Sequence, residues 1–193
     1  MKIFTEQEKF WANEFGNEYL NRNQIKDLLP KKINMFSEIL KNTLSIKSFL
    51  EFGPNSGVNL LAIRNLIPNS ILSGVEVNEN ALDELKGLNI CENLWHDSML
   101  NFNKKNIAEM SFTSGVLIHL NPDYLNKAYE ALYLSSKRYI LICEYYNPTP
   151  TSVIYRGHEN KLFKRDFAGE ILSKYSDLEL VNYSFVYKRD NNF

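Results

Sequence analysis

The sequence predicts an α/β fold in which helices cover both faces of a mostly parallel sheet. Strand-like apolar runs alternate with helical segments along the chain, and this alternation is typical of parallel sheets. The run from Tyr139 to Cys143 is almost continuously apolar, as a strand buried on both faces requires. A length of 193 residues and a hydrophobic fraction of 44% suit one globular domain, so we assign residues 1–193 to a single domain.

The expected elements follow one another in a regular order. A helix is indicated where apolar residues recur on one face, as at Ile33, Phe36 and Ile39. Asn121 and Pro122 open another helix, with the asparagine as its cap and the proline at its first position. We expect helices over residues 33–43, 57–67, 79–88, from 122 onward and 166–175, and strands over 48–52, 71–77, 93–95, 110–118, 139–143 and 178–187. Residues 1–30 are expected to form an aromatic helix that caps the core, and residues 145–165 a long loop on the substrate side.

The composition argues against several classes of protein. A net charge of −1 gives no electrostatic reason to expect nucleic acid as the main partner. Cys91 and Cys143 stand in no metal-ligand spacing, so no metal site is expected, and the lysine pairs at 31–32 and 104–105 are interpreted as solvated faces. The N-terminus has no apolar run, and no stretch reaches the roughly 20 apolar residues of a membrane span. We therefore expect a cytoplasmic protein without a membrane partner, and the sequence leaves its oligomeric state open.

The ends of the strands predict where a ligand binds, because open α/β sheets bind ligands at the carboxyl ends of their strands. Gly53 and Gly57 allow a sharp turn after the first strand and close approach of the backbone to a ligand, so we expect a side chain at Gly53 to occupy the ligand's space. Glu76 ends the second strand, 25 residues after Glu51, and an acidic group there suits the paired hydroxyls of a ribose. A dinucleotide fingerprint would need glycines where Asn55 and Val58 stand, so an NAD-dependent oxidoreductase is disfavoured. The pattern indicates an adenosine-type ligand without a pyrophosphate; the alternative is a turn without function.

The motif Glu51-x-Gly53-x-Asn55-x-Gly57 resembles the glycine loop of class I S-adenosylmethionine-dependent methyltransferases, which have a Rossmann-like fold, with asparagine in place of the middle glycine. The resemblance implies S-adenosyl-L-methionine as the cofactor and assigns its parts to successive strand ends. Glu76 and Val77 would meet the ribose, Asp97 and Ser98 the adenine, and Ser114 and Gly115 the methionine portion. In similar enzymes an N-terminal helix covers the cofactor, which would place Trp11 over it and Tyr19 or Arg22 at its carboxylate; the alternative is a helix that simply docks on the core.

A narrower resemblance covers nearly the whole chain. The stretches Glu6 to Trp11, Glu51 to Gly57, Phe112 to Pro122, Tyr139 to Pro150 and Tyr155 to Glu170 are similar to the pseudaminic acid biosynthesis-associated methylase family. This implies methyl transfer to a nonulosonic (pseudaminic-type) acid or a related sugar of a bacterial surface glycan. It also implies a last antiparallel strand after residues 187–190. Because the sequence ends at Phe193, either the sheet lacks that strand or the sequence is cut short, and its loss would leave an unpaired sheet edge.

Several groups are candidates for the chemistry. If the acceptor is a hydroxyl, a general base assists; His119 is the first candidate and His158 the second, with Glu144 and Tyr145 as further catalytic candidates. The structural alternatives are a His119 bonded to nearby backbone and a Glu144 paired with a basic residue. Aromatic and polar groups that suit an acidic sugar, with an arginine for its carboxylate, are Tyr146, Asn147, Tyr155, Arg156 and Arg165. They could instead form a lid packed on its own aromatic residues.

Two other functions compete with a small-molecule methyltransferase. One is a methyltransferase of protein or nucleic acid, and the other is a protein that binds S-adenosylmethionine and has lost catalysis.

Overall fold

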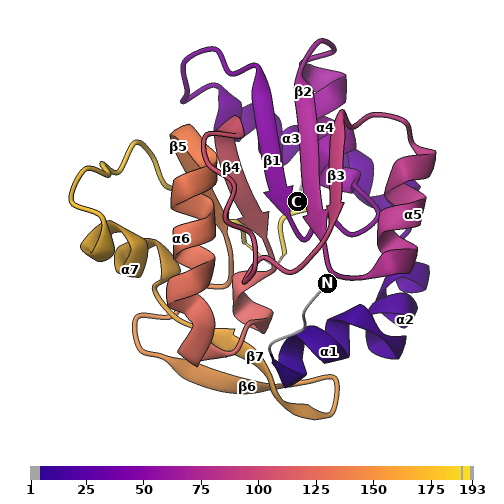
Figure 1. Cartoon of the computed structure of the whole chain (residues 1–193), viewed down its shortest axis with the longest axis vertical. Coiled ribbons are helices and arrows are strands. Elements are labelled where there is room, and N and C mark those ends of the chain that lie inside the picture. Colours follow the sequence, from indigo (N-terminus) through magenta and orange to yellow (C-terminus); the bar gives the residue numbers. More distant parts are fainter. Residues whose placement is uncertain (1–4, 188, 192–193) are drawn as a thin grey trace.

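The computed structural model describes residues 5–187 and 189–191, and its centre is a parallel sheet of five strands. The strands lie in the order β3-β2-β1-β4-β5, so the strand order reverses between β1 and β4, at the middle of the sheet (Figure 1). The strands are β1 (Ser48–Phe52), β2 (Ile71–Glu76), β3 (Asn93–His96), β4 (Ala108–Ser114) and β5 (Ser136–Cys143). This confirms the predicted α/β class with a mostly parallel sheet.

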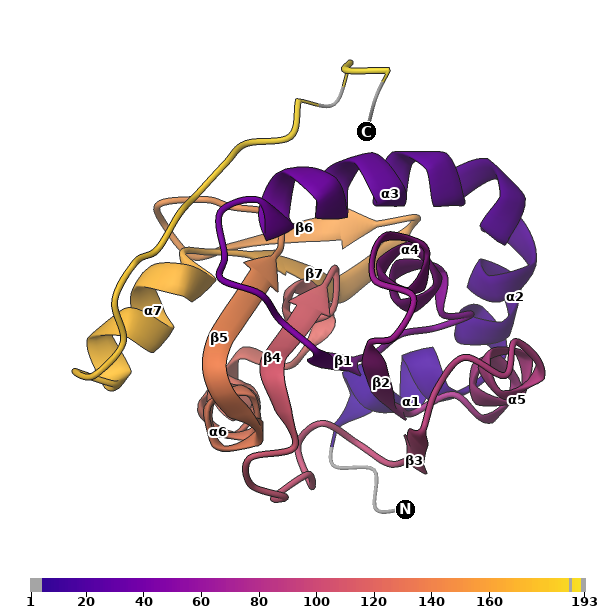
Figure 2. The same cartoon turned by 90° about the horizontal axis from the view of Figure 1, so that it is seen from above.

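Helices cover both faces of the sheet, as predicted. In Figure 2 the helices α3 (Ile25–Leu40), α4 (Val58–Leu66) and α5 (Glu79–Gly87) lie on one face, and α6 (Leu125–Ser135) and α7 (Phe167–Lys174) lie on the other. Alternate residues of β1 point into the two resulting cores. Phe49 packs with Phe36 and Phe112 beneath α3 and α4, whereas Phe52 packs with Leu132 beneath α6.

Two short helices, α1 (Glu6–Ala12) and α2 (Glu14–Arg22), lie across the carboxyl ends of the strands (Figure 1). Thr5 caps α1 in a capping box with Glu8, and the chain turns at Asn13 before α2 begins. The expected N-terminal cap is therefore two helices, followed by the start of α3 at Ile25. Residues 1–4 of the predicted cap lie outside the described residues.

The segment expected as a long loop contains a β-hairpin instead. Strands β6 (Thr151–Tyr155) and β7 (His158–Lys164) pair antiparallel, and Arg156 and Gly157 form the turn with φ of 51° and 87°. Two consecutive positive φ angles are typical of the tight type I′ turn, which usually contains Asn-Gly or Asp-Gly. Because Arg156 stands at the first position of this turn, the sequence lacks the usual turn signal and the hairpin was not predicted.

The predicted strand over residues 178–187 is wrong, because the structure has no strand there. Within residues 5–187, β5 pairs only with β4, and residues 178–187 form no ladder with β5 or with any other strand. Their large apolar side chains stay exposed, with Tyr183 at 82% and Phe185 at 84%. An alternating pattern favours a strand, but a strand forms only where another strand supplies hydrogen bonds.

Several boundaries differ from the expected ones; β5, for example, begins at Ser136 rather than at Tyr139. Strand β4 ends at Ser114, because Gly115 adopts a φ of 72° and the 3₁₀ turn η1 (Leu117–His119) follows. Helix α3 begins eight residues earlier than expected and includes Pro30. The segment after Asn121 begins as the 3₁₀ turn η2 (Pro122–Tyr124), capped as predicted by the Asn121 side chain, and α6 continues it.

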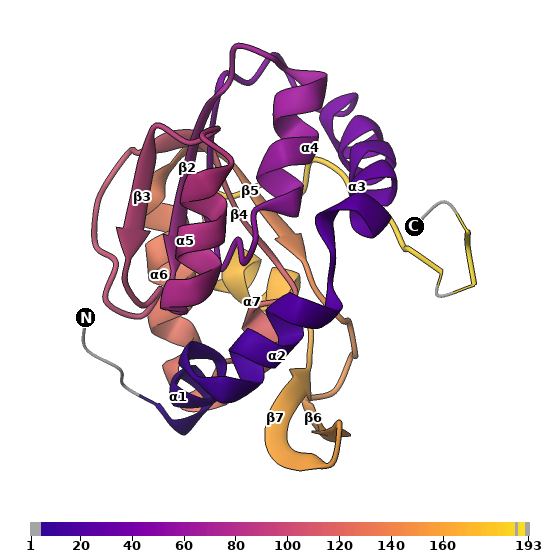
Figure 3. The ribbon, with the colours of Figure 1, turned by 90° about the vertical axis from the view of Figure 1, so that its right-hand side faces the viewer.

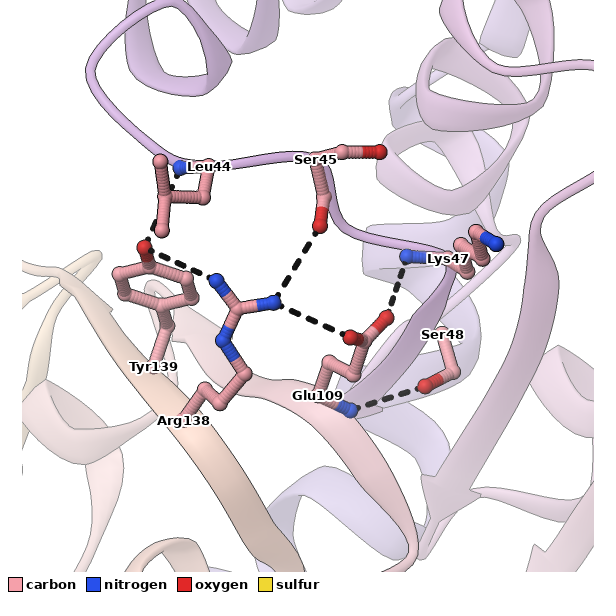
Figure 4. Close-up of polar contacts among 7 residues, drawn as sticks. All are labelled: Leu44, Ser45, Lys47, Ser48, Glu109, Arg138 and Tyr139. Atoms are coloured by element: carbon pink, nitrogen blue, oxygen red, sulfur yellow. Dashed lines mark hydrogen bonds and ion pairs between the residues drawn. The ribbon is translucent and has the colours of Figure 1, made fainter.

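A polar network fixes the amino ends of β1, β4 and β5, at the opposite end of the sheet from α1 (Figure 4). Glu109 accepts a hydrogen bond from the backbone N–H of Lys47 at 2.6 Å and pairs with Arg138 at 3.2 Å. The Lys47 N–H in particular lowers the pKa of Glu109.

In the described part of the chain no helix has the length and apolar character to cross a bilayer, and no cluster of three or more His, Cys, Asp or Glu side chains is arranged to hold a metal.

Candidate functional site

The turn after β1 is built from three residues in the left-handed region. Gly53, Asn55 and Gly57 have φ of 70°, 52° and 86°. Asparagine tolerates this conformation better than other residues with a side chain, which explains how Asn55 can stand where the resembling loops have glycine. Gly57 leads directly into α4, so the turn presents the helix N-terminus at the carboxyl end of the sheet.

The space around these glycines corrects one expectation. A Cβ at Gly53 would lie 2.6 Å from Cγ2 of Val116, and one at Gly57 would lie 2.4 Å from Cδ1 of Leu85. Close packing of the protein itself therefore requires both glycines, and a side chain at Gly53 would not simply fill the ligand's space. Gly115, after β4, is exposed, and a Cβ there would meet nothing within 4 Å.

Glu76 joins the end of β2 to the glycine turn. Its Oε2 accepts a hydrogen bond from the N–H of Asn55 at 2.8 Å, and its Oε1 accepts from the N–H groups of Val77 and Asn78 at 2.9 Å. The side chain is 5% exposed, and burial raises its pKa. A carboxylate offers about four acceptor sites, so one remains for a ligand hydroxyl.

Glu51 is fully buried beneath α4. Asn59 donates to its Oε1 at 2.6 Å, whereas its Oε2 has no hydrogen-bond partner among the described residues. Burial raises the pKa of Glu51 to about 8, and the nearby positive charge of Lys32 acts in the opposite direction. Lys32 was interpreted as part of a solvated face, and its place beside the site follows from the early start of α3.

The ends of β2 and β3 contact the N-terminal helices. Ser98 donates to Glu8 of α1, and Asn78 donates to the carbonyl of Trp11 at 3.0 Å. Asp97 accepts hydrogen bonds from its own loop, from the N–H of Ser98 at 2.8 Å and from Asn101 at 3.0 Å. The structure therefore places Ser98 against α1, with Asp97 next to it in the chain; Figure 3 shows α1 at the carboxyl end of the sheet.

Glu144 follows β5 and holds the turn η1. It accepts hydrogen bonds from the N–H groups of Val116 at 2.9 Å, Leu117 at 3.0 Å and Ile118 at 3.4 Å. Burial raises its pKa to about 7. Glu144 is thus paired with backbone N–H groups and not with the basic residue that was the structural alternative. Because these hydrogen bonds hold η1, Glu144 has the geometry of a residue that positions η1, not of a group that contacts the methyl acceptor.

His119 projects from η1 into an enclosed environment. Its Nδ1 donates to the carbonyl of Lys161 at 2.6 Å, and its ring centroid lies 4.5 Å from that of Trp11 and 4.8 Å from that of Tyr155. The side chain is 8% exposed, and burial lowers its pKa to about 4. The imidazole is therefore neutral at physiological pH.

Rings from four parts of the chain form what we call the aromatic cluster, and many of them lie with centroids between 4.1 and 6.2 Å apart. Its members come from α1, α2, η1 and the β6–β7 hairpin, which lie together at the carboxyl end of the sheet (Figure 3). They are Phe10, Trp11, Phe15, Tyr19, His119, Tyr155 and His158. The cluster unites Trp11, Tyr19, His119, Tyr155 and His158, which the sequence assigned to separate roles. Phe10 and Phe15 were not assigned to the site, although both lie in the segment expected to form an aromatic helix.

The other predicted acceptor residues lie apart from one another. Arg165 is paired with Glu170 at 2.5 Å near α7, whereas Arg156 is exposed at the tip of the hairpin. The seven residues of β7 lie between the two arginines, a path of roughly 23 Å along an extended strand at about 3.3 Å per residue, so the arginines stand at opposite ends of β7. Asn147 donates to Thr149 and Thr151 within its own turn.

Tyr145 and Tyr146 are exposed, and Arg22 pairs with Glu18 at 3.2 Å. Burial is the main cause that raises the pKa of Tyr19, and the charges of Arg156 and Arg22 lower it. Arg156 is therefore close enough to act electrostatically on the aromatic cluster.

No protein-family model matches the chain, and no curated protein matches its sequence. Solved structures do match its fold. A SAM-dependent methyltransferase of Leishmania major has a TM-score of 0.66 at 13% identity, with 88% of this chain and 71% of that chain covered. The sugar N-methyltransferase KedS8 of Streptoalloteichus has a TM-score of 0.58 at 13% identity, with 81% and 66% covered.

The plantazolicin methyltransferase BpumL in complex with SAH has a TM-score of 0.53 at 19% identity, with 70% of this chain and 55% of that chain covered. The chain thus spans little more than half of that enzyme. These similarities show that the chain has the Rossmann-like fold of class I methyltransferases; the resemblance to the pseudaminic-associated family stays a prediction.

Proposed function

We propose that the protein transfers a methyl group from S-adenosyl-L-methionine to a small-molecule acceptor. The observation that carries this proposal is the row of carboxyl groups at the ends of three adjacent strands. Glu51, Glu76 and Asp97 end or follow β1, β2 and β3, around a turn with three left-handed residues. On the fold shared with the methyltransferases above, this is the end of the sheet where ligands bind.

The chemistry of these residues fits S-adenosylmethionine. The cofactor carries an ammonium group, a sulfonium, an amino group on adenine and two ribose hydroxyls, all of which suit acidic or hydrogen-bond-accepting partners. Glu76 and Val77 would hold the ribose, Asp97 and Ser98 the adenine, and Glu51, Ser114 and Gly115 the methionine portion, with Trp11, Tyr19 and Arg22 covering it. Oε2 of Glu51, which is buried without a hydrogen-bond partner in residues 5–187, supports this assignment. When bound, the cofactor supplies a methyl group activated by the sulfonium.

We further propose that the acceptor is a nonulosonic acid or a related sugar. The aromatic cluster supports this, because rings pack against the apolar faces of sugars. Arg156 is the proposed partner of the acceptor's carboxylate, since Arg165 is occupied by Glu170. Among the structures with this fold, KedS8 is a sugar N-methyltransferase.

Calorimetry with S-adenosylmethionine and its demethylated product tests the cofactor. Glu76→Ala should weaken binding by about 1.5–3 kcal/mol, the usual value of hydrogen bonds to a charged group. Glu84→Ala, which removes an exposed carboxylate from α5, is the matched control and should leave the affinity unchanged. Failure of the unmodified protein to bind either compound would contradict the proposed function, and unchanged affinity of Glu76→Ala would remove Glu76 from the ribose site.

Incubation with methyl-labelled S-adenosylmethionine and a panel of nonulosonic acids and nucleotide sugars tests the acceptor. Arg156→Ala should raise the KM for an acidic acceptor and leave the cofactor affinity unchanged. Methylation of neutral sugars alone would contradict the proposed acidic acceptor.

A further inference from the structure

The indole N–H of Trp11 is a buried donor without a partner. Its Nε1 is inaccessible to solvent and has no hydrogen-bond partner among the described residues. Burying an N–H without a partner is costly, so such groups are rare in folded proteins. The Trp11 ring lies in the aromatic cluster, with its centroid 4.5 Å from that of His119. A polar atom that enters the cluster from a ligand would satisfy this donor.

His119, whose ring contacts that of Trp11, carries a hydrogen-bond acceptor. A carbonyl oxygen can only accept, so the bond from Nδ1 to the carbonyl of Lys161 requires the imidazole proton to lie on Nδ1. Nε2 then carries a lone pair, and no hydrogen bond reaches it from residues 5–187. The backbone of η1, held by Glu144 through Val116 and Leu117, fixes the position from which this lone pair is presented.

The N–H donor of Trp11 and the lone pair on Nε2 of His119, both in the aromatic cluster, favour one kind of chemical group among those that a methyltransferase can modify. An ammonium has no lone pair to accept from Trp11, and a carboxylate has no proton to donate to His119. A neutral amine has a single lone pair, and a bond from Trp11 would occupy the electrons needed for attack. A hydroxyl oxygen has two lone pairs and one proton, so it can accept from Trp11, donate to His119 and still attack.

We propose that the acceptor group is a hydroxyl held between Nε1 of Trp11 and Nε2 of His119, and that the protein is an O-methyltransferase. This inference rests on the proposed function. The second lone pair of the hydroxyl oxygen forms the new oxygen–methyl bond while the sulfur–methyl bond breaks and leaves its electron pair on sulfur. The hydroxyl proton moves to Nε2 of His119, and the imidazolium later releases a proton to solvent.

The tautomer of His119 can be tested without an acceptor. Long-range ¹H–¹⁵N spectra of the protein near pH 7 should show Nδ1 protonated and Nε2 unprotonated. A proton on Nε2, or on both nitrogens, would overturn the proposal.

The methylated atom is tested with amino sugars, which carry amine and hydroxyl groups on one molecule. With glucosamine and ¹³C-methyl-labelled S-adenosylmethionine, and with any acceptor found in the panel, the label should appear as an O-methyl signal. An N-methyl product would overturn this inference and leave the proposed function intact. Loss of cofactor binding in calorimetry would instead count against the proposed function.

Two variants separate these roles from packing. Trp11→Phe keeps a ring in the cluster and removes only the N–H, so kcat/KM for the acceptor should fall about tenfold, as expected for one hydrogen bond. Trp95→Phe, at the only other tryptophan, is the control and should not change kcat/KM.

His119→Asn retains a donor for the Lys161 carbonyl but lacks the Nε2 lone pair, so turnover should fall about 10²–10⁴-fold while affinity for the demethylated cofactor is unchanged. Full activity of either Trp11→Phe or His119→Asn would overturn the proposal.

Discussion

Three buried glutamates at the carboxyl end of the sheet reduce the cost of burying a charge in different ways. Glu76 and Glu144 each accept hydrogen bonds from three backbone N–H groups. Glu51 has only Asn59, and the pKa of about 8 that results from its burial means that it is largely protonated at neutral pH. Oε2 of Glu51 is therefore available to a ligand, whereas both oxygens of Glu76 and of Glu144 already accept hydrogen bonds.

The ionisation of Glu51 should make the protein less stable as the pH rises. Its pKa in the folded protein lies above the ordinary value of 4.5, so the folded state keeps a proton that the unfolded chain releases. The contribution of Glu51 to the free energy of unfolding is therefore highest below about pH 4.5. It falls as the pH rises towards 8. Glu51→Gln removes this ionisation and should raise the free energy of unfolding at pH 8 by a few kcal/mol, since each unit of pKa difference corresponds to about 1.4 kcal/mol.

Urea unfolding of both proteins across this pH range measures the effect. Glu109→Gln is the control of opposite sign, because the pKa of Glu109 is lowered in the folded protein and its contribution is lost as the pH falls. A Glu51→Gln protein that is less stable than the parent at pH 8 would contradict this account.

At the scale of elements, α1 and the hairpin form a cover held by the aromatic cluster and by a few polar contacts. Ser98 binds Glu8 of α1, Gln7 donates to the carbonyl of Asn160 at 3.1 Å, and Lys161 pairs with Glu6. The proposed cofactor at the ends of β2 and β3 would lie beneath this cover, and we expect its entry to require α1 to move. Few contacts join α1 to the sheet, and such elements open with a low free energy.

Ser98→Ala should loosen the cover. The variant loses the bond to Glu8, together with the one that Ser98 accepts from the N–H of Leu100 at 2.9 Å in its own loop, so hydrogen exchange of the amides in residues 6–22 should become faster, while those of β1 and β4 stay protected. Ser152→Ala, at an exposed position of β6, is the matched control. Unchanged exchange in α1 would show that the aromatic cluster alone holds it.

The sequence predicted what local pattern determines and missed what distant residues determine. Apolar runs located β1 to β5, and the strand-end rule located Gly53, Glu76 and Asp97 at one edge. No local pattern could connect Trp11 with His119, or His119 with a carbonyl 42 residues later. The hairpin was missed because Arg156 adopts a positive φ, and Lys32 because Pro30, usually a helix breaker, lies inside α3.

At the scale of the whole molecule, the described chain has both an exposed apolar segment and an unpaired sheet edge, that of β5. Residues 178–187 carry large side chains in the open, among them Leu180 at 60% and Val181 at 61% exposure. Unpaired strand edges and contiguous apolar patches both favour association with other chains.

This chain should therefore associate with itself as its concentration rises. Tyr183→Glu combined with Phe185→Lys removes two of the most exposed rings and should shift the chain towards the monomer. Ile154→Lys, which removes an apolar side chain that is 66% exposed on the hairpin and lies outside residues 178–187, should change the association little. Size-exclusion chromatography with light scattering over a range of concentrations measures this, and a parent chain that is monomeric throughout would contradict it.

The bond between His119 and residue 161 has a consequence for how this fold can diverge. The oxygen that orients the imidazole belongs to the main chain, so exchanging the side chain at Lys161 leaves it in place while β7 stays paired with β6, as Leu162 is with Val153. During evolution, positions 119 and 161 need not change together for this bond to persist. An alignment of related sequences would then show a conserved histidine at position 119 and no position that co-varies with it. The backbone carbonyl that sets its tautomer could be identified only from a structure.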